Sequence, residues 1–274
     1  MAQRVAMAYD GAMNEVALTI AGSDPSGGAG IQADLKTFQQ HGVYGTTVLT
    51  MLTVQNTHGV SGIEVLEPGF VKRQLEAVLT DMPPAAAKTG AMGNAAGIEA
   101  VAGVLEKTDF PLVVDPVMVS KHGQPLLDDA AVSAVKERLL PRALLVTPNR
   151  HETRVLSGID PVDEEEAQRA AEAIGALGCA NVLVKGLRHG QVICDLLWSR
   201  GEGVERFEAP LIETTRLHGS GCVFSAAICS HLALGETLSH AVEAARRFIT
   251  LAITEAPRIG GGVGPVATSI SLTW

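Results

Sequence analysis

The chain has 274 residues, a formal net charge of −9 at pH 7, 46% hydrophobic residues and 19% charged residues. This composition predicts a globular protein with a sizeable core, and the acidic balance without a basic run argues against nucleic-acid or anionic-membrane partners. The 4 cysteines form neither a C-x-x-C pair nor a zinc-type cluster, which indicates reduced thiols in a cytoplasmic protein. Residues 1–14 lack a continuous apolar segment and are interpreted as an N-terminal extension, not a signal peptide.

The first predicted elements are a strand over 16–21, a glycine-rich loop over 22–30 and a helix over 31–38. This order is typical of an α/β domain that binds a nucleotide or another small ligand. The loop is not a Walker A motif, because no Lys-Ser or Lys-Thr follows its glycines. A dinucleotide fingerprint is also weak, because no acidic residue ends a second strand at the required distance. The alternative interpretation is a turn that only allows the helix to pack on the strand.

Strand-length apolar runs and helical runs alternate along the rest of the chain. Further strands are expected over 46–54, 85–89, 112–115, 143–147 and 181–185. Helices are expected over 70–79, 95–105, 128–140, 164–177, 221–234 and 236–255. Two antiparallel strands are expected over 192–199 and 204–209, and they predict an antiparallel edge of the sheet. The pattern predicts one α/β domain over residues 15–274, with a mostly parallel central sheet covered by helices on both faces.

The segment His-Gly-Ser-Gly-Cys over 218–222 leads into one of these helices. Glycine allows positive φ and close approach of the backbone to a ligand. The amides that follow lie at a helix N-terminus, where they lack partners and favour an anion. Cys222 is the first side chain after this anion-binding segment, and we expect the helix N-terminus to lower its pKa. The alternative is a plain glycine-rich loop with Cys222 as a small core residue.

Polar residues follow the apolar runs at several expected strand ends: Asp115, Asn149, Glu152 and Lys185. In a doubly wound sheet such residues meet at the edge where ligands bind. Two carboxylates suit Mg²⁺, usually held through water, and a lysine suits the phosphates of a nucleotide. Each residue also has an ordinary structural explanation as a turn former, a first-turn helix residue or a surface charge. Together they favour a site for a metal and a polyphosphate.

Five segments of the chain, in order, resemble the hydroxymethylpyrimidine/phosphomethylpyrimidine kinases of thiamine biosynthesis, which belong to the ribokinase-like superfamily. These segments are 17–38, 54–60, 115–118, 147–152 and 218–222. The resemblance spans about residues 15–267 and implies a ribokinase-like three-layer α/β/α fold. It also implies transfer of phosphate, dependent on ATP and Mg²⁺, to 4-amino-5-hydroxymethyl-2-methylpyrimidine and then to its monophosphate. A homodimer is a further implication.

The same resemblance assigns roles to individual residues. The implied acceptor pocket contains Gly22, Asp34, Gln55 and Val117, with the Gln55 amide hydrogen-bonding the pyrimidine. The family pattern Lys-x-Gly-Met is interrupted here by Ala91, so Met92 is the residue expected at the pocket wall.

The remaining implied roles concern phosphate transfer. Asp115 and Glu152 would order Mg²⁺ and its waters, and Asn149 and Lys185 would bind the triphosphate of ATP. The implied anion hole consists of Gly219, Ser220 and Gly221. Cys222 would accept the hydroxymethyl proton or contact the pyrimidine.

Two other functions remain open at this stage. A pyridoxal or pyridoxine kinase of the same superfamily would use a similar pocket and a hydroxymethyl acceptor. A non-catalytic sensor could bind the pyrimidine, because a fold does not fix a function. The four polar residues at the strand ends argue against a sensor, which needs no apparatus for a metal and a triphosphate.

Overall fold

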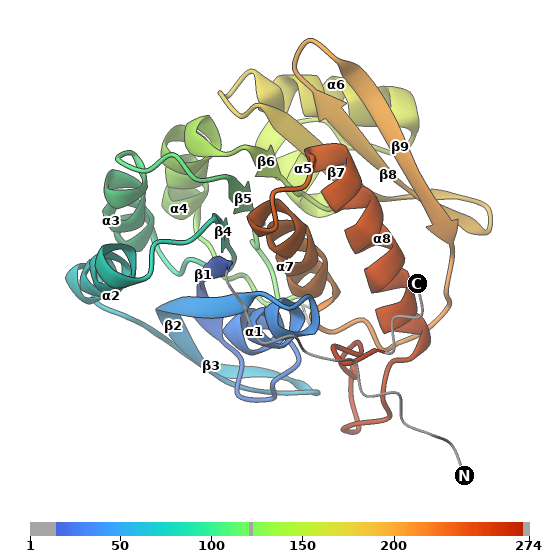
Figure 1. The fold of residues 1–274 in the computed structure, drawn as a ribbon. Coiled ribbons are helices and arrows are strands. Elements are labelled where there is room, and N and C mark those ends of the chain that lie inside the picture. The colour runs from blue at the N-terminus through green and yellow to red at the C-terminus, as the bar shows by residue number, and fades with distance from the viewer. Residues whose placement is uncertain (1–14, 121–122, 271–274) are drawn as a thin grey trace.

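The computed structural model describes residues 15–120 and 123–270 (Figure 1), so the N-terminal extension expected over residues 1–14 lies outside the described part. The described strands form one sheet in the order β3-β2-β1-β4-β5-β6-β7-β8-β9. Their bounds are β1 Val16–Ser23, β2 Tyr44–Asn56, β3 Gly59–Val65, β4 Ala86–Thr89, β5 Leu112–Val114, β6 Leu145–Val146, β7 Asn181–His189, β8 Val192–Ser199 and β9 Gly203–Pro210. The six strands β1, β2 and β4 to β7 pair in parallel. The predicted single α/β sheet is therefore confirmed.

The sheet has an antiparallel hairpin at each edge. At one edge β7, β8 and β9 pair antiparallel, as the sequence predicts. At the other edge β3 pairs antiparallel with β2, and this strand was not predicted. The reason is its composition, because β3 contains two glycines and its side chains are exposed or half-buried rather than alternating between core and solvent.

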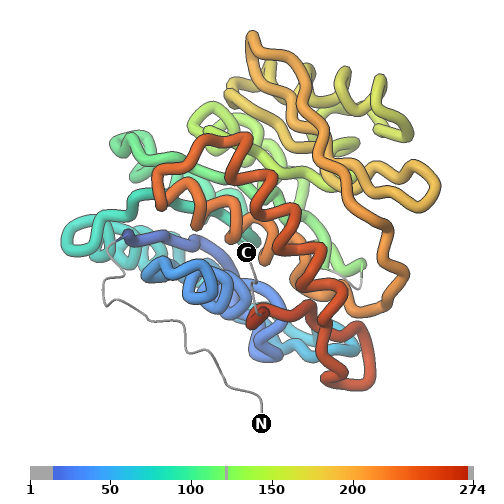
Figure 2. Tube along the Cα trace, turned by 45° about the vertical axis from the view of Figure 1, so that its right-hand side comes forward, coloured from blue at the N-terminus to red at the C-terminus, as the bar shows by residue number. Residues whose placement is uncertain are grey.

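Helices cover both faces of the sheet (Figures 1 and 2), which confirms the three-layer arrangement. One face carries α1 (Gly30–Gln40), α7 (Ser220–Ala233) and α8 (Leu238–Thr254), which share a hydrophobic core with the sheet. The other face carries α2 (Pro68–Asp81), α3 (Ala95–Leu105), α4 (Asp129–Ala134), α5 (Arg150–Ser157) and α6 (Glu164–Gly175). No helix in the described part of the chain combines the length and apolarity that a membrane crossing requires.

In two of the predicted elements a proline accounts for the difference between the expected and the observed bounds. The helix expected over 128–140 is α4 followed by a π-helical turn, η1 (Val135–Leu139), and a 3₁₀ turn, η2 (Leu140–Arg142). Pro141 cannot donate to a carbonyl one turn earlier, so a regular helix cannot continue through it. Strand β6 is shorter than the expected 143–147, and Pro148 lacks the N–H needed to extend it.

Candidate active site

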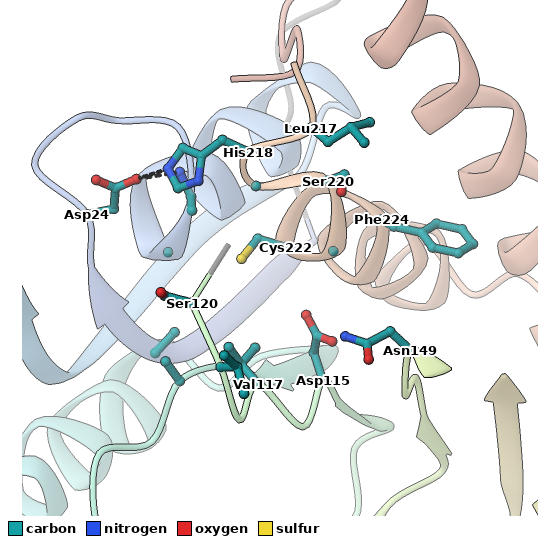
Figure 3. Close-up of a pocket in the computed structure, with 18 of the residues that line it drawn as sticks. Asp24, Asp115, Val117, Ser120, Asn149, Leu217, His218, Ser220, Cys222 and Phe224 are labelled. Carbon is teal, nitrogen blue, oxygen red and sulfur yellow. Dashed lines mark hydrogen bonds and ion pairs between the residues drawn. The ribbon is translucent and has the colours of Figure 1, made fainter. Parts of the chain in front are cut away.

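A cavity of about 590 Å³ lies at the carboxyl ends of the parallel strands. It is bordered by the β1–α1 loop, strand β2, the loops after β4, β5 and β6, strand β7 and the N-terminus of α7 (Figure 3). Of the residues expected in the site, all except Asp34 and Met92 line this cavity. The placement follows from the parallel topology, which brings strand ends that are far apart in sequence to one edge.

The N-terminus of α7 forms one wall of the cavity. Its N-cap residue is Gly219, with φ +75°, and no side chain caps the helix. The Ser220 N–H donates to Leu217 O at 3.2 Å, and the remaining amides of the first turn stay available to an anion. A Cβ built on Gly219 would lie 1.8 Å from the carbonyl oxygen of Gly28, so only glycine allows this close approach of the two glycine-rich loops.

Asp115 and Lys185 face this helix from the sheet. The Lys185 Nζ atom donates to Asp115 Oδ1 at 3.1 Å, and the Ser225 hydroxyl on α7 donates to Asp115 Oδ2 at 3.2 Å. Burial by itself would raise the pKa of Asp115, but the charges of Lys185 and Lys88 outweigh it and hold the pKa below its ordinary value. A Cβ on Gly221 would lie 3.7 Å from Asp115 Oδ2 and 3.8 Å from Lys185 Nζ. The anion-binding helix end and this ion pair are thus direct neighbours.

Asn149 and Glu152 form a capping box at the start of α5. The Asn149 side chain accepts from the Glu152 N–H at 3.0 Å, and the Glu152 carboxylate accepts from the Asn149 N–H at 2.8 Å. This reciprocal pair satisfies two amides of the helix start and fixes both side chains at the cavity. Burial raises the pKa of Glu152 to about 7, with the negative charge of Asp115 adding to the effect and Lys185 opposing it.

The donor set at this edge fits Mg²⁺. Asp115 and Glu152 supply carboxylate oxygens, and the positive charge of Lys185 acts to lower the pKa of both groups. Within the described residues, no group of three or more His, Cys, Asp or Glu side chains forms a complete metal cage. Mg²⁺ is usually held by one or two carboxylates together with water and substrate phosphates, so two carboxylates beside a phosphate site are sufficient.

The opposite side of the cavity is built by the β1–α1 loop and β2. Gly22 at the end of β1 and Gln55 on β2 line it, as expected for an acceptor pocket, whereas Val117 lines the cavity from the loop after β5, beside Asp115 (Figure 3). A Cβ on Gly22 would come within 2.9 Å of the Met51 side chain, so glycine leaves room for the cavity wall. The Thr53 hydroxyl donates to Gln55 Oε1 at 3.3 Å, which orients the amide group.

The expected positions of Asp34 and Met92 are wrong. Asp34 is fully buried beneath the cavity, where it accepts from the Thr19 hydroxyl at 2.6 Å and from Lys88 Nζ at 2.9 Å. It serves a buried ion pair instead of the pocket. Met92 is 2% exposed and packs in the hydrophobic core, while Gly90 and Ala91 line the cavity in its place. The extra residue between Gly90 and Met92 places the methionine away from the wall.

Cys222 lines the cavity, and Figure 3 shows its sulfur pointing toward the interior. The expected lowering of its pKa is wrong. Burial raises the pKa of Cys222 to about 12, and the carboxylate charges of Asp34 and Asp115 outweigh the opposing effect of Lys88. The thiol is therefore neutral near pH 7.

Two further pairs of charged or titratable side chains at the cavity received no role from the sequence. Asp24 and His218 form a buried pair at 2.7 Å on the acceptor side. At the other end Arg246 on α8 is held by Asp195 on β8 at 3.0 Å. Asp24 and His218 lie inside the two glycine-rich segments that the sequence singles out, whereas Arg246 and Asp195 carry no local signal.

Comparison with known proteins gives relatives over nearly the whole chain. A hydroxymethylpyrimidine/phosphomethylpyrimidine kinase of Synechococcus elongatus is 44% identical over 255 residues, covering 92% of this chain and 96% of the relative. One of Haemophilus influenzae is 46% identical, covering 90% and 94%.

Two solved structures are similar as well. A phosphomethylpyrimidine kinase of Clostridium difficile has 40% identity and a TM-score of 0.78, covering 87% of this chain and 99% of that one. An ADP complex of Bacillus subtilis pyridoxal kinase has 37% identity and a TM-score of 0.84, covering 93% and 97%. The family described as phosphomethylpyrimidine kinase matches residues 24–267, which include every cavity-lining residue described above except Gly22. From its sheet order, its cavity and these relatives together, the chain belongs to the phosphomethylpyrimidine kinase family.

Proposed function

We propose that this protein is an ATP-dependent kinase of thiamine biosynthesis. It phosphorylates 4-amino-5-hydroxymethyl-2-methylpyrimidine and then the monophosphate, giving the diphosphate. The observation that supports this most directly is the first turn of α7 lying directly beside the Asp115–Lys185 pair in one cavity of about 590 Å³. The curated relatives carry the same activity in their names.

Phosphate transfer needs positioning and charge neutralisation more than covalent chemistry. In the proposed mechanism, the segment of Gly219, Ser220 and Gly221 binds the oxygens of the transferring group through the amides of its two glycines, because the Ser220 N–H is bonded to Leu217 O. Lys185 and Asn149 bind the triphosphate. Asp115 and Glu152 hold Mg²⁺ mainly through water, and the ion would neutralise charge that develops on the phosphate oxygens. Because Lys185 already pairs with Asp115, its ammonium is held in place before ATP arrives.

Acceptor recognition is assigned to the other half of the cavity. The Gln55 amide offers a donor and an acceptor to an aminopyrimidine edge, and Val117 provides an apolar wall. Cys222 lies between this half and the anion hole, so we assign its neutral thiol a contact with the acceptor rather than the role of a strong base.

A pyridoxal kinase is the second candidate. Solved pyridoxal kinases of Bacillus subtilis and Staphylococcus aureus have TM-scores of 0.84 and 0.85 to this chain, at 37% and 35% identity. Identity to the curated pyrimidine kinases is higher, at 44% and 46% for the two named above, so the pyrimidine is favoured. A non-catalytic sensor is disfavoured because the relatives are named as kinases.

The decisive experiment is product analysis by mass after incubation with ATP, Mg²⁺ and each acceptor. We expect addition of one and then two phosphates to the pyrimidine. Parallel steady-state assays should give a higher kcat/KM for the pyrimidine than for pyridoxal. The reverse order would assign the protein as a pyridoxal kinase, and binding without transfer would favour the sensor. The homodimer and the cytoplasmic location remain predictions.

A further inference from the structure

Asp24 and His218 join the two glycine-rich loops of the site. Asp24 lies in the β1–α1 loop, and His218 directly precedes the anion-hole glycine Gly219. The His218 Nε2 atom lies 2.7 Å from Asp24 Oδ2, and both side chains are 4% exposed (Figure 3). The two residues are 194 positions apart in sequence, so this contact exists only in the folded protein.

The Asp24 carboxylate also organises its own loop. It accepts from the Ser26 N–H, the Ser26 hydroxyl and the Ala29 N–H, each at 2.9 Å. These hydrogen bonds and His218 hold the pKa of Asp24 below its ordinary value although burial opposes them. One ionised carboxylate thus fixes both the acceptor-side loop and the imidazole ring.

The backbone of His218 is fixed as firmly as its ring. Its N–H donates to Gly264 O at 3.1 Å, and its carbonyl accepts from the Val266 N–H at 3.1 Å. The ring packs against Gly28, where a Cβ would lie 2.5 Å from His218 Cδ2. Because Gly219 is the next residue, a shift of His218 would move the start of α7.

The pair also bears on Gln55. The side-chain amide nitrogen of Gln55 lies 3.4 Å from His218 Nε2, the same ring nitrogen that faces Asp24. An ionised Asp24 requires Nε2 to carry a proton and donate it, and a nitrogen that donates cannot also accept from the Gln55 amide. The Gln55 N–H on that side therefore remains available to a bound acceptor.

We propose that Asp24 and His218 are positioning residues that set the anion hole in register with the acceptor pocket. The pair acts through Gly219 and Gln55 and does not touch the transferring phosphate. This inference rests on the proposed function only for the identity of the acceptor, because the register of the anion hole also governs how the site binds a phosphoryl mimic. It predicts that damage to the pair lowers turnover more than substrate binding.

The test compares His218→Ala, His218→Gln, Asp24→Ala and the double alanine variant with wild type. The matched control is His189→Ala, an exposed histidine on β7 outside the cavity. We expect His218→Ala to lower kcat by about 100-fold, as a shift of about 1 Å in a catalytic group does, with KM for ATP changed by less than about 3-fold. His218→Gln should recover about 10-fold, because its amide can donate to Asp24. The control should match wild type.

A second readout does not depend on the acceptor. Binding of ADP with Mg²⁺ and aluminium fluoride, which mimics the transferring group, should weaken in His218→Ala while binding of ADP alone is unchanged. The double variant should be no worse than the poorer single variant, because two residues that act as a unit are non-additive. The proposal would be overturned if the kcat losses of the two single variants multiplied in the double variant, or if kcat were unchanged in His218→Ala. It would also be overturned if binding of ADP alone weakened as much as binding of the aluminium fluoride complex. Absence of product from wild type with either acceptor would instead refute the proposed function. Thermal melting would show whether the alanine variants fold. If they do not, His218→Gln and Asp24→Asn replace them, and the readout is again the affinity for the aluminium fluoride complex relative to the affinity for ADP alone.

Discussion

Replacement of Gly219 by alanine tests whether the close approach of two loops sets the anion hole. A methyl carbon there would lie 1.8 Å from Gly28 O and 2.8 Å from Gly28 C, both main-chain atoms that cannot rotate away. Contacts below 3.0 Å essentially never occur for a real Cβ, so the loops would have to separate by at least about 1.2 Å. The positive φ of +75° adds strain of about 1 kcal/mol for a non-glycine residue.

A displacement of about 1 Å at a catalytic group costs about 100-fold in rate, or about 2.7 kcal/mol of barrier. We therefore expect Gly219→Ala to lower kcat by at least this factor, with a smaller effect on KM for the acceptor. Steady-state assays with ATP and the hydroxymethyl pyrimidine would measure it.

Gly235→Ala is the matched control for this prediction. Gly235 also has a positive φ, of +82°, but a Cβ there meets nothing within 4 Å. This variant should lose about 1 kcal/mol of stability, a fall of about 3 °C in Tm, and keep its kcat. A Gly219→Ala protein with kcat within about 3-fold of wild type would refute the reasoning, because the loop separation would then not matter to transfer.

Three further predictions concern buried groups. Cys222→Ala should lower kcat by about 10-fold or less, whereas loss of an essential base would lower it by about 10²-fold or more. In the wild-type protein Cys222 should be alkylated more slowly at pH 7 than a free cysteine, as mass spectrometry can show. Lys88→Met should cost about 3–5 kcal/mol in urea denaturation because it strands the Asp34 carboxylate, and the added change Asp34→Asn should restore part of the loss. Burial beside His231 lowers the pKa of His41 to about 3, so between that value and about 6.5 the unfolded chain binds more protons and stability falls as the pH falls. Between pH 7 and pH 5 the free energy of unfolding should fall by about 2 kcal/mol more in wild type than in His41→Phe, as chemical denaturation can measure. An equal fall in the two proteins would contradict the assignment.

Local signals predicted most of the fold. The helices predicted over 95–105 and 164–177 begin where expected, because the side chains of Asn94 and Asp163 cap them. Strand β3 was missed because its pairing with β2 depends on a neighbour and not on its own pattern. The break of the helix after Ala134 was missed although Pro141 marks its end.

The site was less predictable where residues distant in sequence meet. The strand-end positions of Asp115 and Lys185 follow from topology alone, and both residues line the cavity. Nothing local shows that Asp34 is paired with Lys88, 54 residues away, and so removed from the pocket. The Asp24–His218 contact joins segments that are 194 residues apart, so no local sequence pattern reveals it.

The β2–β3 hairpin lies at the outer border of the sheet, whereas Asp115 and Lys185 stand near its middle. Gln55, the acceptor residue proposed on this hairpin, can consequently be exchanged without moving the strands that carry Asp115 and Lys185. Acceptor preference can therefore change at the border of the sheet while the phosphate-handling centre is retained. This separation offers a physical reason why proteins named for pyridoxal and for a pyrimidine share one architecture.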